Sequence, residues 1–183
     1  GRDRSGDFNL LKQVGLDYGF EVVDTNTLKF EDERVSSTRI RQALADADFE
    51  AAERMLGRPY SISGRVIVGQ QLGRTIGSPT ANVELHRLRS PMQGVYAVEV
   101  EGVADTLWPA VANVGVRPTI GDLTKAILEV HLIGFKQNIY RKNIKVIFRK
   151  HLRNEIKFNG LDELKAQIAK DVEHASQYFE LEK

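Results

Sequence analysis

The sequence predicts a mainly β fold, a small antiparallel barrel or sandwich, preceded by a short α/β segment and followed by one long helix. Downstream of Pro59, short runs of β-forming residues alternate in polarity and are separated by glycine, proline and asparagine at close intervals. Residues 1–56 instead alternate helical and extended patterns, as α/β units do. Near the C-terminal end the apolar residues return to helical spacing.

The first segment is too short to form a sheet by itself. Its helices are recognised by a capping side chain followed by apolar residues every three or four positions. The expected elements are a helix capped by Asp7 and ended by Gly19, a strand at residues 20–23, a helix capped by Ser36 or Ser37 that runs through Leu44, and a helix capped by Asp48 that carries Phe49, Ala52, Met55 and Leu56.

The second segment contains six candidate strands with no helix between them, which favours an antiparallel barrel or sandwich over a parallel sheet. The strands are expected at residues 61–68, 81–84, 95–101, 108–114, 126–133 and 144–152. Leu161, Leu164, Ile168, Val172 and Phe179 then fall on one face of a helix that would cover one face or end of the barrel.

Composition excludes several classes of protein. With 42% hydrophobic and 28% charged residues, the chain can bury a core, and its short apolar runs do not predict a membrane span. The absence of cysteine excludes disulfides, thiolate metal sites and a cysteine nucleophile, and it favours the reducing cytoplasm. Because the first residue is Gly1 rather than methionine, we expect the sequence to begin inside a longer protein.

The overall charge of +1 hides a difference between the two segments. Residues 1–56 hold 8 Lys/Arg and 12 Asp/Glu, whereas residues 57–183 hold 18 and 13, giving net charges of −4 and +5. This asymmetry agrees with the change in periodicity. We therefore predict two domains, 1–56 and 57–183.

The glycine-rich segment 69–82 is the first candidate for chemistry. Gly69, Gly73 and Gly77 are spaced by four residues and permit close approach of backbone amides to an anion, while Arg74 adds a charged donor. The segment lacks the Gly-Lys-Ser/Thr ending of a Walker A motif. It suits a phosphate, although a long turn that requires glycine explains the same residues.

Thr80 and Asn82 lie two positions apart, so on a strand they project from the same face. A hydroxyl and a carboxamide oxygen are ligands that can hold Mg²⁺ when substrate phosphates complete its coordination. A turn capped by these two side chains is the structural alternative.

Glu129 is a candidate general base. Leu128, Val130 and Leu132 make one apolar face of the predicted strand, so Glu129 and His131 share the other face. A carboxylate held on a rigid strand can accept a proton from an attacking hydroxyl, and His131 could orient it. A solvated glutamate is the alternative, and the four histidines show no metal-ligand spacing.

The helix start Ser36-Ser37-Thr38-Arg39-Ile40-Arg41 is a second possible anion site, because hydroxyls, free amides and two arginines gather there. A helix cap with arginines that face solvent explains the same residues.

Together these motifs resemble the riboflavin kinase module, which in bacteria is fused to an FMN adenylyltransferase module in a bifunctional enzyme. The kinase resemblance rests on the Pro79-Thr80-Ala81-Asn82 motif in its glycine-rich setting and on several ordered matches downstream. These are residues 94–96, 113–119, 129–131 and 152–155, with Phe158. Residues 1–7 and 36–41 resemble the last part of the adenylyltransferase module.

The resemblance implies a six-stranded Greek-key barrel with a C-terminal helix, and ATP-dependent phosphorylation of riboflavin to FMN. The implied roles are Mg²⁺ and ATP-phosphate binding by Thr80 and Asn82, a general base at Glu129, ATP binding by Gly69, Arg74 and Tyr140, and flavin binding by Arg153 and Phe158. The ligands would thus be riboflavin or FMN and ATP or ADP, with neither nucleic acid nor membrane.

The resemblance also sets a limit on activity. The adenylyltransferase family depends on an early His-x-Gly-His motif, and this sequence has no histidine before His86. We therefore expect residues 1–56 to be the rear part of that module, and we expect no FAD synthesis from this chain.

Two other functions compete with kinase activity. A basic barrel could bind single-stranded nucleic acid, but this requires exposed aromatic residues for base stacking. Phe148, the one aromatic residue among the basic residues of 141–153, is expected in the core. A protein-interaction module would leave the glycine-rich loop, the Thr80/Asn82 pair and Glu129 without a common purpose.

Overall fold

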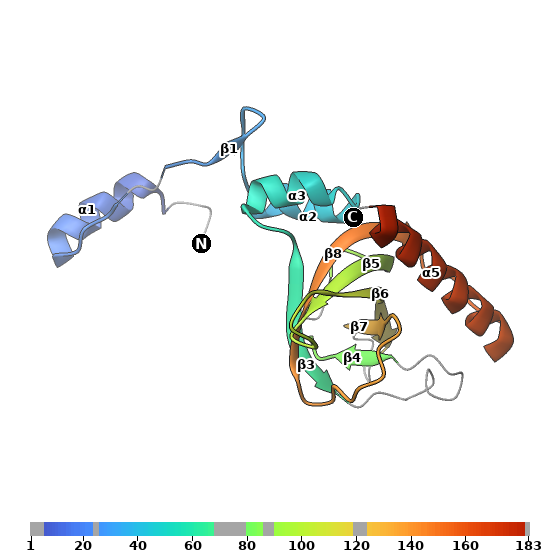
Figure 1. Ribbon diagram of the computed structural model, residues 1–183. Coiled ribbons are helices and arrows are strands. Elements are labelled where there is room, and N and C mark those ends of the chain that lie inside the picture. Colours follow the sequence, from blue (N-terminus) through green and yellow to red (C-terminus); the bar gives the residue numbers. More distant parts are fainter. Residues whose placement is uncertain (1–5, 24–25, 68–79, 86–89, 119–123, 182–183) are drawn as a thin grey trace. The chain divides into compact units, whose positions relative to one another are not determined.

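The structure is a computed structural model that describes residues 6–23, 26–67, 80–85, 90–118 and 124–181 (Figure 1). The chain forms two compact units, Gly1–Val35 and Ser36–Lys183. None of the helices in the described ranges is long and apolar enough to cross a membrane.

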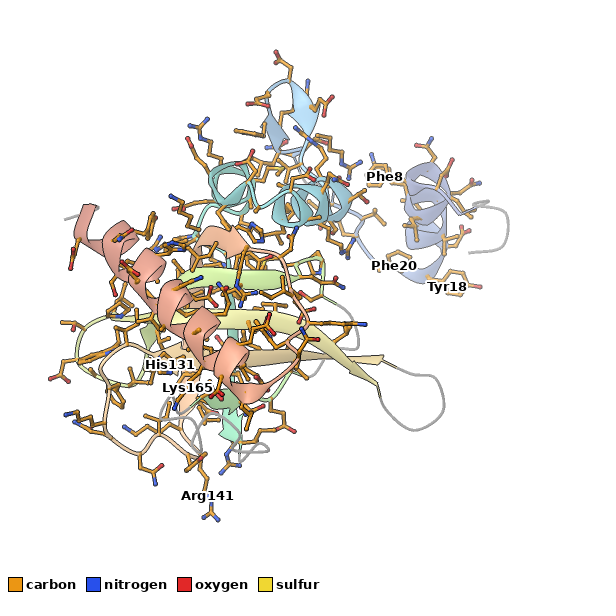
Figure 2. All side chains as sticks on the ribbon, turned by 90° about the vertical axis from the view of Figure 1, so that its right-hand side faces the viewer. Phe8, Tyr18, Phe20, His131, Arg141 and Lys165 are labelled. Atoms are coloured by element: carbon orange, nitrogen blue, oxygen red, sulfur yellow. The ribbon has the colours of Figure 1, made fainter. Side chains whose placement is uncertain are left out.

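The first unit contains helix α1, Phe8–Tyr18, and a two-stranded hairpin of β1, Lys29–Phe30, and β2, Glu33–Arg34. Leu10 donates its amide to the Asp7 carboxylate at 2.8 Å, and Gly19 ends the helix with a left-handed backbone, as predicted. Most large apolar side chains of this unit are exposed to solvent, and the rings of Phe8, Phe20 and Tyr18 are 37%, 45% and 80% exposed (Figure 2). Its described residues therefore contain no hydrophobic core.

The predicted strand at residues 20–23 is wrong, because this segment has no regular secondary structure. The hairpin lies further along, where Glu31 and Asp32 both adopt positive φ and form its turn. A short apolar run predicts a strand only if a partner strand lies beside it, and residues 20–23 have none among the described residues.

The second unit is dominated by a closed six-stranded antiparallel barrel. Each predicted strand is present within a few residues of its expected limits. The strands are β3 (Ser61–Ile67), β4 (Ala81–Val83), β5 (Gly94–Glu101), β6 (Trp108–Pro118), β7 (Thr124–Leu132) and β8 (Asn143–Arg153).

The barrel has Greek-key connectivity. Its spatial order is β3-β4-β7-β6-β5-β8, so the consecutive strands β5, β6 and β7 are neighbours and β8 returns beside β5. Alternate residues point inward, and Val98, Val100, Ala110, Ala112, Val130 and Val146 are fully buried in the main core. Phe148 is 1% exposed and belongs to this core, as expected.

Helices α2, Ser37–Ala45, and α3, Phe49–Leu56, pack on the barrel. Ser36 and Asp48 cap them, as predicted. Leu44 and Ala52 are buried in the barrel core, and the Phe49 ring lies 6.2 Å from Phe148 and 5.9 Å from Tyr96 between ring centroids.

The compact unit that contains the barrel consequently begins at Ser36, 21 residues before the predicted domain boundary at Gly57. The reason is that α2 and α3 contribute side chains to the barrel core. Which domain family residues 36–56 belong to is a separate question, and the boundary at 56/57 remains a prediction.

Helix α5, Leu161–Leu181, covers the outer face of β5, β6 and β8 (Figure 1). A second core forms beneath it, in which Val95, Ala97, Val111 and Ala175 are buried. Leu164, Ile168, Val172 and Phe179 face the barrel as predicted, but Leu161 is 55% exposed. The outer face of the barrel is thus apolar where α5 covers it.

Candidate functional site

Glu129 lies on the outer face of the barrel. In β7 the side chains of Leu128, Val130 and Leu132 are buried in the main core, whereas Glu129 and His131 are half-buried on the opposite face. This is the orientation that the alternating sequence predicts. Glu129 is therefore carried by the middle of a strand with hydrogen-bonded neighbours on both sides.

Two carboxamide side chains flank Glu129. It is the register partner of Asn82 in β4 and of Asn113 in β6. Residues directly opposite each other in antiparallel strands point to the same face, with Cβ atoms about 5 Å apart. The row Asn82-Glu129-Asn113 therefore places hydrogen-bonding groups side by side across three strands.

A cavity of about 140 Å³, here called the helix-side cavity, lies against this face and the N-terminal half of α5. In Figure 2, α5 lies in front of the strands, with His131 and Lys165 labelled near its N-terminal half. The polar part of the cavity wall includes Asn113, Glu129 and Arg153. Its apolar part is formed by Val95, Val111, Ile156, Phe158, Leu164 and Ile168. This combination suits a largely apolar ligand with a polar end.

A second cavity of about 570 Å³, here called the turn-side cavity, lies against residues 134–140, the turn between β7 and β8. Tyr140 lines it, as do Phe135 and Ile139. Trp108 supports this turn, because its indole donates to the Ile133 carbonyl at 2.9 Å and its ring contacts that of Phe135. Thr80 and His131 border both cavities.

Arg153 lines the helix-side cavity but is also part of an ion pair. Its Nε and Nη2 atoms donate to the two carboxylate oxygens of Asp171 at 2.8 and 2.7 Å, and Nη1 donates to the Asn154 carbonyl. Asp171 is 3% exposed and accepts a further hydrogen bond from Gln167. Arg153 thus joins the end of β8 to the middle of α5, and this structural role was not predicted.

Phe158 and Glu155 complete the cavity wall between β8 and α5. The Phe158 ring lies 6.0 Å from the Arg153 guanidinium carbon, which is a cation–π contact. The Glu155 carboxylate lies over Gly115, where a Cβ atom, if the residue had one, would come within 2.4 Å of Oε1. A larger residue at position 115 would displace Glu155, so this glycine gives the carboxylate its place in the wall.

The side-chain oxygens of Thr80 and Asn82 are suitable ligands for a magnesium ion that is bound to the phosphates of a nucleotide. Both offer neutral oxygen atoms, which coordinate Mg²⁺ when phosphates supply the remaining ligands. Within the described ranges, no group of three or more His, Asp or Glu side chains could hold a metal by itself. These residues therefore suit a shared site rather than a protein-only metal centre.

The structure brings five of the predicted site residues, Thr80, Glu129, Tyr140, Arg153 and Phe158, to two adjoining cavities. Asn82 lines neither cavity but is the register neighbour of Glu129. Gly69 and Arg74, the predicted ATP-binding loop residues, lie outside the described residues.

Sequence reasoning missed three residues of the helix-side cavity: Asn113, Glu155 and Asp171. Asp171 lies three residues after Ile168 and one before Val172, so a carboxylate on the apolar stripe of α5 was the available signal. Asn113 and Glu155 lie in the segments 113–119 and 152–155 that resemble the riboflavin kinase module, but their place in the cavity wall depends on contacts between strands and loops that are distant in sequence.

The fold and its two cavities define a Greek-key barrel with a row of polar side chains on the outer face of its strands, beside a cavity. The sequence profile of the family described as Flavokinase, riboflavin kinase, matches residues 56–179. The chain therefore belongs to the riboflavin kinase family.

Two curated relatives are bifunctional riboflavin kinase/FMN adenylyltransferases. The protein from Escherichia coli K12 is 51% identical over 183 residues, which is 100% of this chain and 58% of the relative. That from Haemophilus influenzae is 50% identical over 98% of this chain and 58% of the relative. The chain spans less than three fifths of the length of these relatives.

A solved structure also resembles the chain. A protein from Streptococcus pneumoniae, described as a macrolide-efflux protein, matches with a TM-score of 0.72 and 35% identity. The match covers 96% of this chain and 56% of that protein. The resemblance thus extends through both compact units.

Proposed function

We propose that this chain transfers the γ-phosphoryl group of ATP to the 5′-hydroxyl of riboflavin, giving FMN and ADP. The family match supports this reaction class, and one observation supports its location. Thr80 and His131 border both cavities, and Glu129 lies beside them in the helix-side cavity. An acceptor in one cavity and a phosphate donor in the other would meet beside the carboxylate.

The helix-side cavity is proposed to bind the flavin. Its apolar side chains from β5, β6 and α5 suit an isoalloxazine ring, and its polar residues lie where a ribityl chain could reach them. Phe158 is proposed to contact the ring. Arg153 is proposed to contribute through the exposed part of its guanidinium, because Asp171 holds the rest.

The turn-side cavity is proposed to bind ATP, with Tyr140 near the nucleotide and Thr80 at the phosphate end. Gly69 and Arg74 are proposed to bind the phosphates through loop amides and the guanidinium. Thr80 and Asn82 would hold Mg²⁺ together with those phosphates, and the ion would supply neutralisation of their charge.

Glu129 is proposed to be the general base. Phosphoryl transfer proceeds through a loose transition state, so alignment and charge stabilisation contribute most of the catalysis. As the riboflavin oxygen bonds to the γ-phosphorus and the bond to the β-phosphate oxygen breaks, the hydroxyl proton passes to a Glu129 oxygen. The rigid strand keeps this carboxylate at the cavity wall, and the leaving group is ADP.

Nucleic-acid binding is less well supported by the geometry. Phe148 is buried, and among the described barrel strands no aromatic side chain is among the exposed large hydrophobic residues. Base stacking on a barrel surface needs such a side chain. The kinase proposal explains more of the residues at the site, because it gives a role to Thr80, Asn82 and Glu129 together.

Residues 1–56 are proposed to belong to an FMN adenylyltransferase domain. The two bifunctional relatives match the chain across this segment as well as the barrel. We further propose that this chain performs only the kinase step, because it lacks the histidine motif on which adenylyl transfer depends.

The test is a product assay with the purified chain. Riboflavin, ATP and Mg²⁺ are incubated with the protein, and the flavins are separated by chromatography with fluorescence detection. We expect FMN to form only when ATP and Mg²⁺ are both present, and we expect no FAD. Failure to form FMN under these conditions would contradict the kinase proposal, and FAD formation would contradict the restriction to one step.

A further inference from the structure

Asn113 has a side-chain oxygen that the described fold does not use. Its Oδ1 atom is buried and has no hydrogen-bond partner among the described residues. Buried acceptors in native proteins almost always accept a hydrogen bond from protein, water or a ligand. An acceptor without a partner has lost its hydrogen bonds to water, and nothing offsets that desolvation free energy. An unsatisfied oxygen in a cavity wall therefore points to a ligand that donates a hydrogen bond.

The position of Asn113 places this oxygen beside the proposed base. Its neighbours in β6, Ala112 and Val114, are fully buried in the main core, so Asn113 faces the opposite side, toward α5. It is the register partner of Glu129 in β7. Side chains that oppose each other in this way are close enough for two neighbouring groups of one ligand to contact both.

The chemistry of the oxygen restricts the ligand. A carboxamide oxygen only accepts, so its partner must carry an O–H or N–H group. The ionised phosphates of ATP offer acceptors, and Asn113 lines the helix-side cavity but not the turn-side cavity. The acceptor substrate is therefore the better partner than the nucleotide.

We propose that Asn113 Oδ1 accepts a hydrogen bond from a second hydroxyl of the ribityl chain, close to the one that is phosphorylated. This inference rests on the proposed kinase function, in which the reacting 5′-hydroxyl contacts Glu129. The ribityl chain carries further hydroxyls at its 2′, 3′ and 4′ positions. Asn113 is thus a substrate-binding residue that selects a flavin with a hydroxylated side chain.

The test compares Asn113→Leu with wild type. Leucine has a similar branched shape and removes the acceptor without opening a large cavity. We expect KM for riboflavin to rise about tenfold, the effect of one neutral hydrogen bond, and KM for ATP to stay unchanged. The melting temperature of the ligand-free protein should stay the same or rise, because the variant no longer buries an unpaired oxygen.

Riboflavin analogues that lack the 2′-, 3′- or 4′-hydroxyl identify the partner. For wild type, removal of one of these hydroxyls should raise KM about tenfold, whereas for Asn113→Leu the same removal should have almost no further effect. Such loss of additivity is specific to a direct contact. Asn143→Ala is the matched control, since Asn143 is an exposed asparagine on β8 that lines neither cavity.

The outcomes separate this inference from the proposed function. If wild type and Asn143→Ala form FMN but Asn113→Leu has a normal KM for riboflavin, the inference is wrong and the kinase proposal stands. Full additivity with all three analogues would also overturn it, because Asn113 would then act through protein structure alone. If wild type forms no FMN, both proposals fail together.

Discussion

Arg153 at the end of β8 donates two hydrogen bonds to Asp171 in the middle of α5, at 2.8 and 2.7 Å. Because the carboxylate is almost fully buried, this is not a surface ion pair, and its loss would affect stability. It holds the helix that forms one wall of the helix-side cavity.

Asp171→Ala should therefore lower the free energy of unfolding by about 3 kcal/mol, because it leaves the Arg153 charge without its partner in a largely desolvated position. Chemical denaturation measures this change. Glu173→Ala, two residues away on the same helix but exposed, is the control and should stay within about 0.5 kcal/mol of wild type. Equal effects of both substitutions would mean that the ion pair does not stabilise α5.

Glu129→Gln should lower kcat for FMN formation at least about a hundredfold, the usual contribution of a general base. Glutamine keeps the size of the side chain, so the melting temperature should change little. Glu101→Gln, on exposed β5 surface where the carboxylate pairs with Lys145, provides the control and should retain full activity. A Glu129→Gln protein with near-normal kcat would remove Glu129 from the role of base.

Phe49→Ala should lower barrel stability by about 3 kcal/mol, because the ring packs against Phe148 and Tyr96 and truncation leaves a cavity there. Phe8→Ala, in the first unit, should leave the unfolding of the barrel unchanged. Deletion can extend this test: a chain that starts at Ser36 should keep its barrel stability, whereas one that starts at Gly57 should lose stability. Equal stability of the two shortened chains would show that α2 and α3 are dispensable.

Gly94→Ala should be strongly destabilising, by about 3 kcal/mol or more, since two effects act at this residue. Its φ is +116°, and a Cβ would lie 2.6 Å from the Arg153 carbonyl oxygen. Gly57 also has positive φ but has open space around it, so Gly57→Ala should cost only about 1 kcal/mol. Thermal unfolding measures the two effects. Gly57→Ala reports the backbone strain alone, and Gly94→Ala reports the strain together with the steric clash.

The raised pKa of Tyr96 should make the protein less stable at alkaline pH. Burial raises its pKa from 10.0 to about 12. Above pH 10 the unfolded chain releases the phenol proton while the folded protein retains it. The free energy of unfolding should therefore fall as pH rises from 10 to 12, by up to about 2 kcal/mol.

Tyr96→Phe provides the comparison, measured by urea denaturation across this pH range. The variant should be about 1 kcal/mol less stable at pH 7, because it lacks the hydrogen bond to the Gln93 carbonyl, and should show a flatter decline in alkali. A decline as steep as in wild type would assign the alkaline sensitivity to other groups.

The strands and helices of the second unit were predictable because their signals are local. Polarity alternates along β7, and a capping side chain precedes each of α2 and α3. The same alternation identified the face on which Glu129 lies. No neighbouring strand has to be known for such inferences.

Relationships between strands were not predictable in this way. The opposition of Asn113 and Glu129 depends on the register of β6 with β7, which no sequence period reveals. The buried ion pair of Arg153 with Asp171 depends on where α5 crosses the barrel. For the same reason the packing of α2 and α3 on the barrel could not be predicted from their sequences.

Greek-key closure has a consequence for synthesis of the protein. β8 pairs with both β3 and β5, so it forms the last two strand pairings that close the barrel. When translation has reached Leu132, five of the six strands exist but β3 and β5 each have an unpaired edge. Open edges invite pairing with other chains. Stable folding must therefore wait until Arg153 has left the ribosome, and nascent chains shorter than this should remain sensitive to proteases.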